Sequence, residues 1–230
     1  MDTTISNVKH QHSSSKSSLK IRHRQIRALC DEETITVYQA YNAEIASHAV
    51  QHQKLNASPL FKPGRMTWIK PSWCWMMYRS GYSFKDKNQE RILALKMRRT
   101  DFLVLLEKAV LATKMAARGT GDSKGVARDE GEEERRSDDV RVQWDPERSM
   151  RLERLEYRSI QIGIRGDTRT HWIMNSIVAI EDVTEMAQSL KAALDEDPRV
   201  SEQELVQRGL LPQEKPVEAS KILHEILEMD

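Results

Sequence analysis

Short segments in which apolar or β-branched residues alternate with polar ones recur along this chain, with helix signals between them. Alternation with a period of two is typical of a half-buried β-strand. Five such segments stand out, at residues 34–41, 66–69, 91–97, 140–144 and 159–164. Because strands and helices are interspersed, we expect an α+β fold: a single domain with a mixed sheet of about five strands and flanking helices.

Residues with helix-capping chemistry stand before several of the helical stretches. Asn42 is predicted to cap one helix, and Ser72 to cap an aromatic helix that Gly81 ends. Thr100 or Asp101 is predicted to cap a further helix. These signals place most helix starts without any knowledge of the tertiary fold.

Charge is unevenly distributed along the 230 residues, although the formal net charge is only +1. We expect a disordered basic tail rich in Ser and His at 1–21, and a single domain at 22–194. Residues 118–139 hold eight acids and only two apolar residues, which predicts a disordered insert in that domain. Residues 195–230 hold ten acids against four basic residues and are predicted to form an acidic C-terminal extension.

Several classes of protein are excluded by composition. The two cysteines, Cys30 and Cys74, cannot form a disulfide-rich scaffold or an all-cysteine zinc site, and Cys74 is expected to be buried and inert. His48 and His52 have helical i, i+4 spacing, but no nearby acid or cysteine completes a ligand set, so no metal site is predicted. No apolar run is long enough to span a membrane, and no secretory signal is evident. We expect an intracellular protein, cytoplasmic or nuclear.

The most unusual stretch is 62–99, which has ten basic residues against two acids and six of the chain's thirteen aromatic residues. Positive charge attracts phosphate, and flat rings stack on bases. Lys70 ends a predicted strand just before the start of the Ser72 helix, where backbone N–H groups favour anions, and Arg79 lies two turns along that helix. This pattern predicts a phosphate-binding pocket in which Lys70 and Arg79 are the candidate catalytic residues.

Further polar and aromatic residues are candidates for binding the substrate. Arg158 begins a strand in which Ser159 and Gln161 share one face. We expect Lys70, Arg79 and Arg158 to line a single pocket. The full set of predicted substrate-binding residues is Tyr38, Gln39, Trp68, Ser72, Trp75, Arg158, Ser159 and Gln161.

Structural explanations remain open for the same residues. Trp73, Trp75 and the methionines beside them are also typical of a helix packed in a core, and a strand with one polar face is typical of a half-covered sheet. The chain contains no P-loop, G-x-G-x-x-G, G-x-S-x-G or H-E-x-x-H motif. A bare scaffold without a site therefore stays an alternative.

Longer runs of sequence resemble a known family. The runs are 24–28 and 35–42, then 65–72 with 75–81, and finally 140–148 with 157–163. They are similar to the family catalogued as domain of unknown function 4291, over about residues 22–194. Some fungal members carry a label suggesting ATP-dependent RNA ligase, so the resemblance implies nucleotide and RNA as substrate classes. The K-x-D-G motif of covalent ligases does not occur in this sequence.

The sequence as a whole favours a nucleotide- or RNA-directed enzyme of the transferase or ligase-like type, with ATP or NAD as possible cofactor. The alternative is a non-catalytic module that binds nucleic acid or protein. The two differ in one observable: an enzyme needs Lys70, Arg79, Arg158 and Gln161 to converge in one pocket, whereas a scaffold has them apart or exposed.

Overall fold

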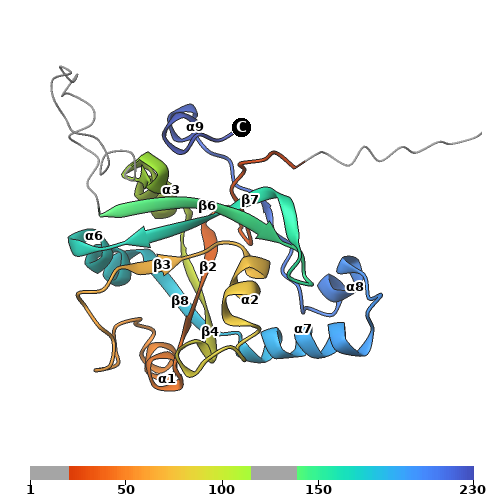
Figure 1. Cartoon of the computed structure of the whole chain (residues 1–230). Coiled ribbons are helices and arrows are strands. Elements are labelled where there is room, and N and C mark those ends of the chain that lie inside the picture. The colour runs from red at the N-terminus through yellow and green to blue at the C-terminus, as the bar shows by residue number, and fades with distance from the viewer. Residues whose placement is uncertain (1–20, 115–138) are drawn as a thin grey trace, which may run out of the picture.

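The computed structural model describes residues 21–114 and 139–230, so the predicted tail at 1–21 and the insert at 118–139 lie almost entirely outside the described residues. The described part is an α+β domain in which strands and helices are interspersed, as the sequence predicts (Figure 1). The strands form three sheets of two, three and four strands instead of one mixed sheet.

The three-stranded sheet is antiparallel and has the order β2-β4-β8. β2 (Thr34–Tyr41) pairs along its whole length with β4 (Arg91–Arg98), and β4 pairs on its other side with β8 (Ile177–Asp182). Two of these strands have the bounds expected from alternation to within one residue. β8 has no strand partner on its outer edge in the described part of the chain.

A single side chain covers part of that outer edge. Gln53, the residue that ends α1 (Ala43–His52), has a left-handed backbone with φ of 50°. Its amide Nε2 donates to the Ile180 carbonyl at 2.9 Å, and its Oε1 accepts from the Ile180 N–H at 2.9 Å. The Gln53 amide therefore makes the same pair of hydrogen bonds that a neighbouring strand would make.

The four-stranded sheet has the order β3-β7-β6-β5. β6 (Val140–Arg148) and β7 (Arg154–Ile164) form a long hairpin, β3 (Thr67–Ile69) adds to β7, and β5 (Val110–Leu111) adds in parallel to β6. In Figure 1 the β6–β7 hairpin crosses the molecule, with α3 (Arg99–Glu107) and α9 (Lys221–Leu227) on one side and α2 (Trp73–Ser80) on the other.

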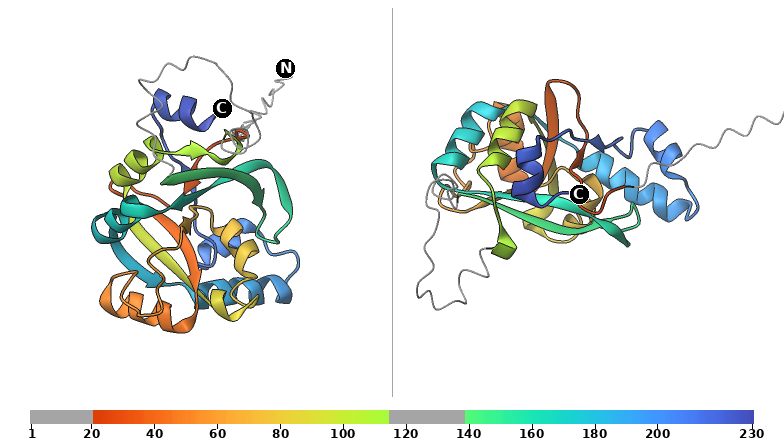
Figure 2. Two further views of the ribbon diagram at one scale, coloured as in Figure 1. Left: turned by 60° about the vertical axis from the view of Figure 1, so that its left-hand side comes forward. Right: turned by 90° about the horizontal axis from the view of Figure 1, so that it is seen from above.

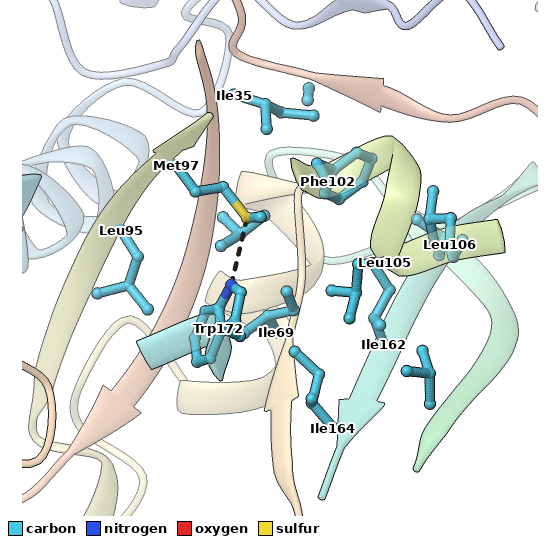
Figure 3. Close-up of a cluster of buried hydrophobic side chains, with 14 of the residues drawn as sticks. Ile35, Ile69, Leu95, Met97, Phe102, Leu105, Leu106, Ile162, Ile164 and Trp172 are labelled. Atoms are coloured by element: carbon cyan, nitrogen blue, oxygen red, sulfur yellow. Dashed lines mark hydrogen bonds between the residues drawn. The ribbon is translucent and has the colours of Figure 1, made fainter. Parts of the chain in front are cut away.

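The main core fills the space between the two larger sheets and α3. Met97 and Ile35 from the three-stranded sheet meet Ile162 from β7 and Phe102 from α3, all of them buried (Figure 3). Trp172 lies in a π-helical turn (Trp172–Ser176) after α6 (Gly166–His171) and donates through its indole N–H to the sulfur of Met97 at 3.5 Å. This buried apolar area supplies the main driving force for folding.

A second buried cluster lies around α2. This cluster contains Tyr38, Trp73, Met76 and Met77, which pack against the apolar face of α7 (Thr184–Glu196) that includes Leu190. Trp73 and the two methionines therefore pack in the core, which is the structural alternative considered for this helix in the sequence.

The sequence predicts that the domain ends at 194, but residues of the acidic C-terminal extension pack against that domain. The extension forms α8 (Glu202–Gln207), β9 (Lys215–Pro216) and α9, and β9 pairs with β1 (Arg27–Ala28). The side chains of Leu205, Val217, Leu223, Ile226 and Leu227 are buried. Figure 2 shows α9 beside the first residues of the domain, so the folded body runs to the end of the chain.

Within the described ranges, no helix is both long enough and apolar enough to cross a membrane.

Candidate ligand site around Lys70

One face of the four-stranded sheet carries polar side chains at neighbouring positions. The register pairs Asp145 with Ser159 and Gln143 with Gln161, so these four residues share a face. Gln161 donates to Gln143 through Nε2 at 3.0 Å. The opposite face holds the buried isoleucines of β7 and packs against the main core.

Trp68 of β3 lies on the same polar face, because it pairs with Gly163. The glycine has no side chain, and the Trp68 ring occupies the space above it. A Cβ at position 163 would lie only 2.9 Å from that ring and 2.8 Å from the sulfur of Met66. Gly163 therefore sets how closely Trp68 approaches the sheet.

Lys70 follows β3 and is held in place by its backbone. Its carbonyl accepts from the Tyr38 N–H at 2.7 Å, and its N–H donates to the Tyr38 carbonyl at 3.3 Å. The side chain is 6% exposed, and Nζ lies 4.5 Å from the ring centroid of Trp75. Across the described ranges, no carboxylate forms a salt bridge with Lys70. The amine is therefore buried with a ring as its main close partner.

This environment changes the acid–base chemistry of the lysine. Burial and, secondly, the positive charge of Arg79 lower the pKa of Lys70 to about 8, while the Asp145 carboxylate opposes the shift. Burial also raises the pKa of Asp145, and the charges of Lys70 and Arg158 partly offset that effect. With this pKa, about a tenth of the Lys70 side chains carry a neutral, nucleophilic amine at pH 7, and half of them do at pH 8.

α2 begins directly after Lys70-Pro71 and places two further residues beside it. Ser72 caps the helix, accepting from the Trp75 N–H at 3.0 Å, as predicted. Trp75 and Arg79 are four residues apart and so share one face of α2. Arg79 is exposed, and its guanidinium forms no hydrogen bond or salt bridge within the structured part of the chain. Lys70, Trp75 and Arg79 are thus brought together as the sequence spacing suggested.

The start of α2 itself is not free to bind an anion. Ser72 Oγ donates to Glu147 Oε1 at 2.9 Å, and the Trp73 N–H donates to Glu214 Oε1 at 2.7 Å. Two carboxyl groups of the protein occupy the place where a phosphate was expected. A phosphorylated ligand would have to be held by side chains, not by this helix start.

Three of the predicted binding residues have structural roles. Tyr38 is 2% exposed and packs edge-on against Trp73, with the ring centroids 5.1 Å apart, so it cannot stack on a base. Gln39 is buried and donates to the Trp68 carbonyl at 2.8 Å. Ser159 is buried next to Glu147, and its hydroxyl contributes to lowering the pKa of that carboxyl against the larger raising effect of burial.

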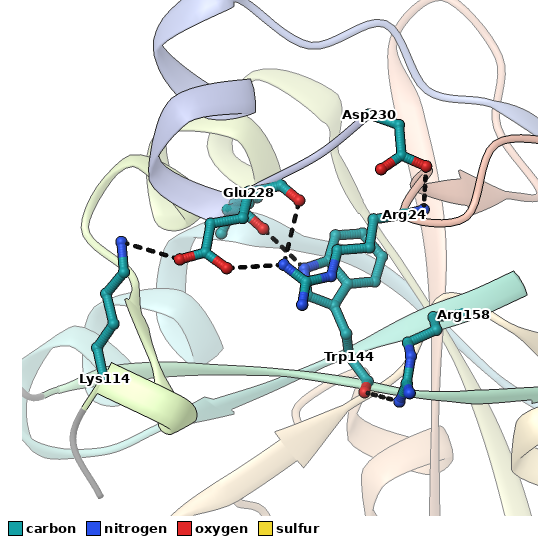
Figure 4. A network of polar contacts seen from close by, with 7 residues as sticks. Arg24, Lys114, Trp144, Arg158, Glu228 and Asp230 are labelled. Atoms are coloured by element: carbon teal, nitrogen blue, oxygen red, sulfur yellow. Dashed lines mark hydrogen bonds and ion pairs between the residues drawn. The ribbon is translucent and has the colours of Figure 1, made fainter. Parts of the chain in front are cut away.

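Arg158 does not join Lys70 in one cavity. Ile69 pairs with Ile162, and Arg158 lies four residues before Ile162, so the register directs Arg158 to the face opposite Lys70. Its guanidinium donates to the Trp144 carbonyl at 3.1 Å (Figure 4). The structure therefore does not support the expectation of a single pocket lined by Lys70, Arg79 and Arg158.

Sequence reasoning missed the residues of β6 that complete the polar face. Gln143 and Asp145 lie there, and Arg141 joins them because it pairs with Gly163 beside Trp68. Arg141 Nε and Asp145 Oδ2 are buried without a hydrogen-bond partner. The signal was available, since residues 141, 143 and 145 alternate with the apolar Val140, Val142 and Trp144 in the same way as Ser159 and Gln161 alternate with isoleucines.

Fold and site together define an α+β protein with a polar sheet face and a buried lysine that forms no salt bridge with any residue in 21–114 or 139–230. The family model described as Domain of unknown function (DUF4291) matches residues 25–217. The chain belongs to this family, which confirms the resemblance seen in the sequence. No curated protein and no solved structure matched the chain.

Proposed function

We propose that the chain is a nucleotide-directed transferase that holds its phosphorylated substrate on the polar face around Lys70. The observation that carries the proposal is the Lys70 amine, which is buried beside Trp75 and Arg79 and has no salt bridge among the described residues. A buried amine with a lowered pKa is a common feature of catalytic lysines and is costly to keep without a role.

Each group around the amine has a part in this function. Arg79 and Arg141 bind the phosphate oxygens, because neither guanidinium has an ionic partner within the described ranges. Trp68, half-buried on the same face, supplies a ring for stacking on the base. Gln143 and Gln161 offer amide groups to the rest of the ligand.

In the transfer step, neutral Lys70 Nζ attacks the α-phosphorus of ATP. The Nζ–P bond forms, the bond from that phosphorus to the pyrophosphate oxygen breaks, and Asp145 accepts the proton that the amine loses. The nucleotidyl group then passes to an acceptor hydroxyl, which restores the amine.

The test is covalent labelling with ATP that carries a radioactive α-phosphate, read after denaturing electrophoresis. We expect label on the wild-type protein and none on Lys70→Arg, which keeps the charge but stays protonated. Arg79→Ala should bind ATP about 10- to 150-fold more weakly. Lys85→Ala, which changes an exposed lysine just beyond α2, is the matched control. Absence of label, together with no thermal stabilisation by ATP, NAD or short RNA, would reject the proposal.

A non-catalytic nucleic-acid-binding module is the second candidate, and a different surface favours it. Tyr78 and Phe84 are 42% and 66% exposed, and Lys85 and Lys87 lie next to Phe84. Exposed rings beside lysines are suited to single-stranded RNA. Salt-dependent RNA binding that Phe84→Ala weakens and Lys70→Arg leaves unchanged would favour this function over the transferase.

A further inference from the structure

A cavity lies beside the start of α2. Its volume is about 430 Å³, and it is enclosed by the start of α2, the end of the β6–β7 hairpin, α8 and the segment before β9. Lys70, Arg79 and Arg158 do not line it. It is therefore distinct from the site proposed above.

Two carboxyl groups, those of Glu147 and Glu214, line this cavity. Glu147, which is 6% exposed, accepts at Oε1 from Ser72 Oγ and, at 2.7 Å, from the Arg148 N–H. Glu214 accepts at Oε1 from the Trp73 N–H. Because their donors stand on the consecutive residues 72 and 73, the two carboxyl groups are near neighbours. The Ser72, Trp73 and Arg148 donors all bond to Oε1 atoms, and the Ser159 hydroxyl also acts on Glu147, so Glu214 Oε2 is the oxygen left for a ligand.

Acidic side chains outnumber basic ones around these two groups. Glu202 adds a third carboxylate at the cavity wall, against two arginines. Arg27 donates to the Glu214 carbonyl at 2.9 Å, whereas the Arg148 guanidinium lies over the ring of Tyr78 at 3.7 Å, turned to another partner. The cavity therefore has one more carboxyl group than it has basic side chains.

The remainder of the wall is largely apolar. Met150 and Leu155 of the hairpin, Val206 of α8 and Leu211 all line the cavity. An apolar wall with a few converging polar groups at one end is the usual form of a small-molecule site.

We propose that this cavity binds a small organic cation, a primary alkylamine or alkylguanidine, whose charged end lies between Glu147 and Glu214. Its aliphatic stem lies along Met150, Leu155, Val206 and Leu211. The cation supplies the positive charge that the two carboxyl groups lack, and the stem removes apolar wall from water.

Binding of the cation is coupled to release of a proton. Burial and, secondly, the Glu147 carboxylate raise the pKa of Glu214 to about 8, so this carboxyl group is protonated at pH 7 in the empty cavity. A cation favours its ionised form and displaces the proton. Affinity should therefore rise about tenfold per pH unit below pH 8 and level off above it.

Tyr157 and Cys74, which also line the cavity, have pKa values above this pH range. Burial, then the Glu147 carboxylate, raises the pKa of Tyr157 to about 12, and burial raises the pKa of Cys74 well above its usual value. Burial raises the pKa of Glu147 as well, and its hydrogen bonds from Arg148 N and Ser72 Oγ oppose the shift.

The experiment is isothermal titration of the full chain with four probes: pentylamine, agmatine, pentan-1-ol and pentanoate. We expect the two cations to bind about ten- to a hundredfold more tightly than pentan-1-ol, and pentanoate to bind most weakly. At pH 7, titrations in two buffers of different ionisation enthalpy should report close to one proton released per amine bound. Equal affinities for amine, alcohol and carboxylate would overturn the proposal.

Variants locate the site. Glu214→Gln keeps an oxygen for the Trp73 N–H but should lower amine affinity at pH 8.5 at least tenfold and abolish proton release. Glu218→Gln changes an exposed carboxylate on the same segment and should leave both unchanged. Amine binding that Glu214→Gln and Glu147→Gln leave intact would show that the cation binds elsewhere. If either variant fails to fold, the comparison of probes and buffers on the wild-type protein still decides.

Discussion

At the scale of single residues, Lys70 is a buried charge that Trp75 and Asp145 compensate only in part. Its pKa of about 8 lies below the value of about 10.4 expected in the unfolded chain. The unfolded state therefore binds more protons than the native state between these values, and stability rises with pH across that window. Below pH 8 the protonated amine imposes its full penalty on the native state.

Lys70→Met tests this penalty, because methionine fills a similar volume without a charge. We expect the variant to be more stable than the wild type at pH 7, by up to about 3 kcal/mol, with the difference shrinking toward pH 10. Urea denaturation at both pH values measures it. A variant that is less stable at pH 7 would mean that the contact of Lys70 with Trp75 holds the fold.

Gly163 is the second residue whose identity the site depends on. Gly163→Ala inserts a methyl group where the Trp68 ring and the Met66 sulfur already lie within 3 Å. We expect a loss of about 1–3 kcal/mol in unfolding free energy and a displaced Trp68, visible as a shift in tryptophan fluorescence.

Gly64→Ala is the matched control for that substitution. A Cβ at position 64 would meet nothing within 4 Å, so this variant should keep wild-type stability and fluorescence. Equal behaviour of the two variants would show that the approach of Trp68 to the sheet does not matter.

At the scale of elements, α2 shows how far local sequence determines structure. The sequence predicts both ends of this helix, at Ser72 and Gly81. Gly81 has a φ of 58°, in the left-handed region that suits glycine, and its N–H donates to the Met77 carbonyl. By contrast, α3 begins at Arg99 without a side-chain cap, although Thr100 and Asp101 are both good caps. Packing of Phe102 and its neighbours outweighed that local preference.

The residues of the candidate site show the same contrast between local sequence signals and tertiary packing. Lys70, Trp75 and Arg79 are close in sequence, so strand and helix geometry alone placed them together. Arg158 was misplaced because its side follows from the pairing of β3 with β7, which no local pattern specifies. The Glu214 contact with Trp73 spans 141 positions and was likewise invisible in the sequence.

At the scale of the whole molecule, the two ends of the described domain hold each other. Arg24 pairs with Glu228 at 2.8 Å, and its N–H donates to the Asp230 carboxylate at 3.0 Å (Figure 4). Trp144 donates to the Leu227 carbonyl at 2.8 Å. The acidic composition of this segment concealed its few buried apolar residues, which is why the sequence suggested a loose extension.

Deleting residues 221–230 should therefore unfold the domain or nearly so. The deletion removes buried Leu223, Ile226 and Leu227, worth about 4–9 kcal/mol together, against a typical domain stability of about 5–15 kcal/mol. Thermal denaturation followed by circular dichroism measures the loss. Glu228→Gln, which only breaks the exposed ion pairs, should cost less than about 1 kcal/mol. An unchanged melting temperature on deletion would show that α9 contributes nothing to the core.

The hydrogen bonds between Gln53 and Ile180 have a consequence for how copies of this protein meet in solution. An open strand edge is a template on which a second chain can add its own strand, and such growth leads to fibres. The Gln53 side chain here bonds to both the N–H and the carbonyl of Ile180 on β8, so the strand of a second chain cannot form hydrogen bonds with these two groups. Within the described residues, the Gln53 amide thus protects this part of the β8 edge, so a substitution of Gln53 should favour self-association at high protein concentration.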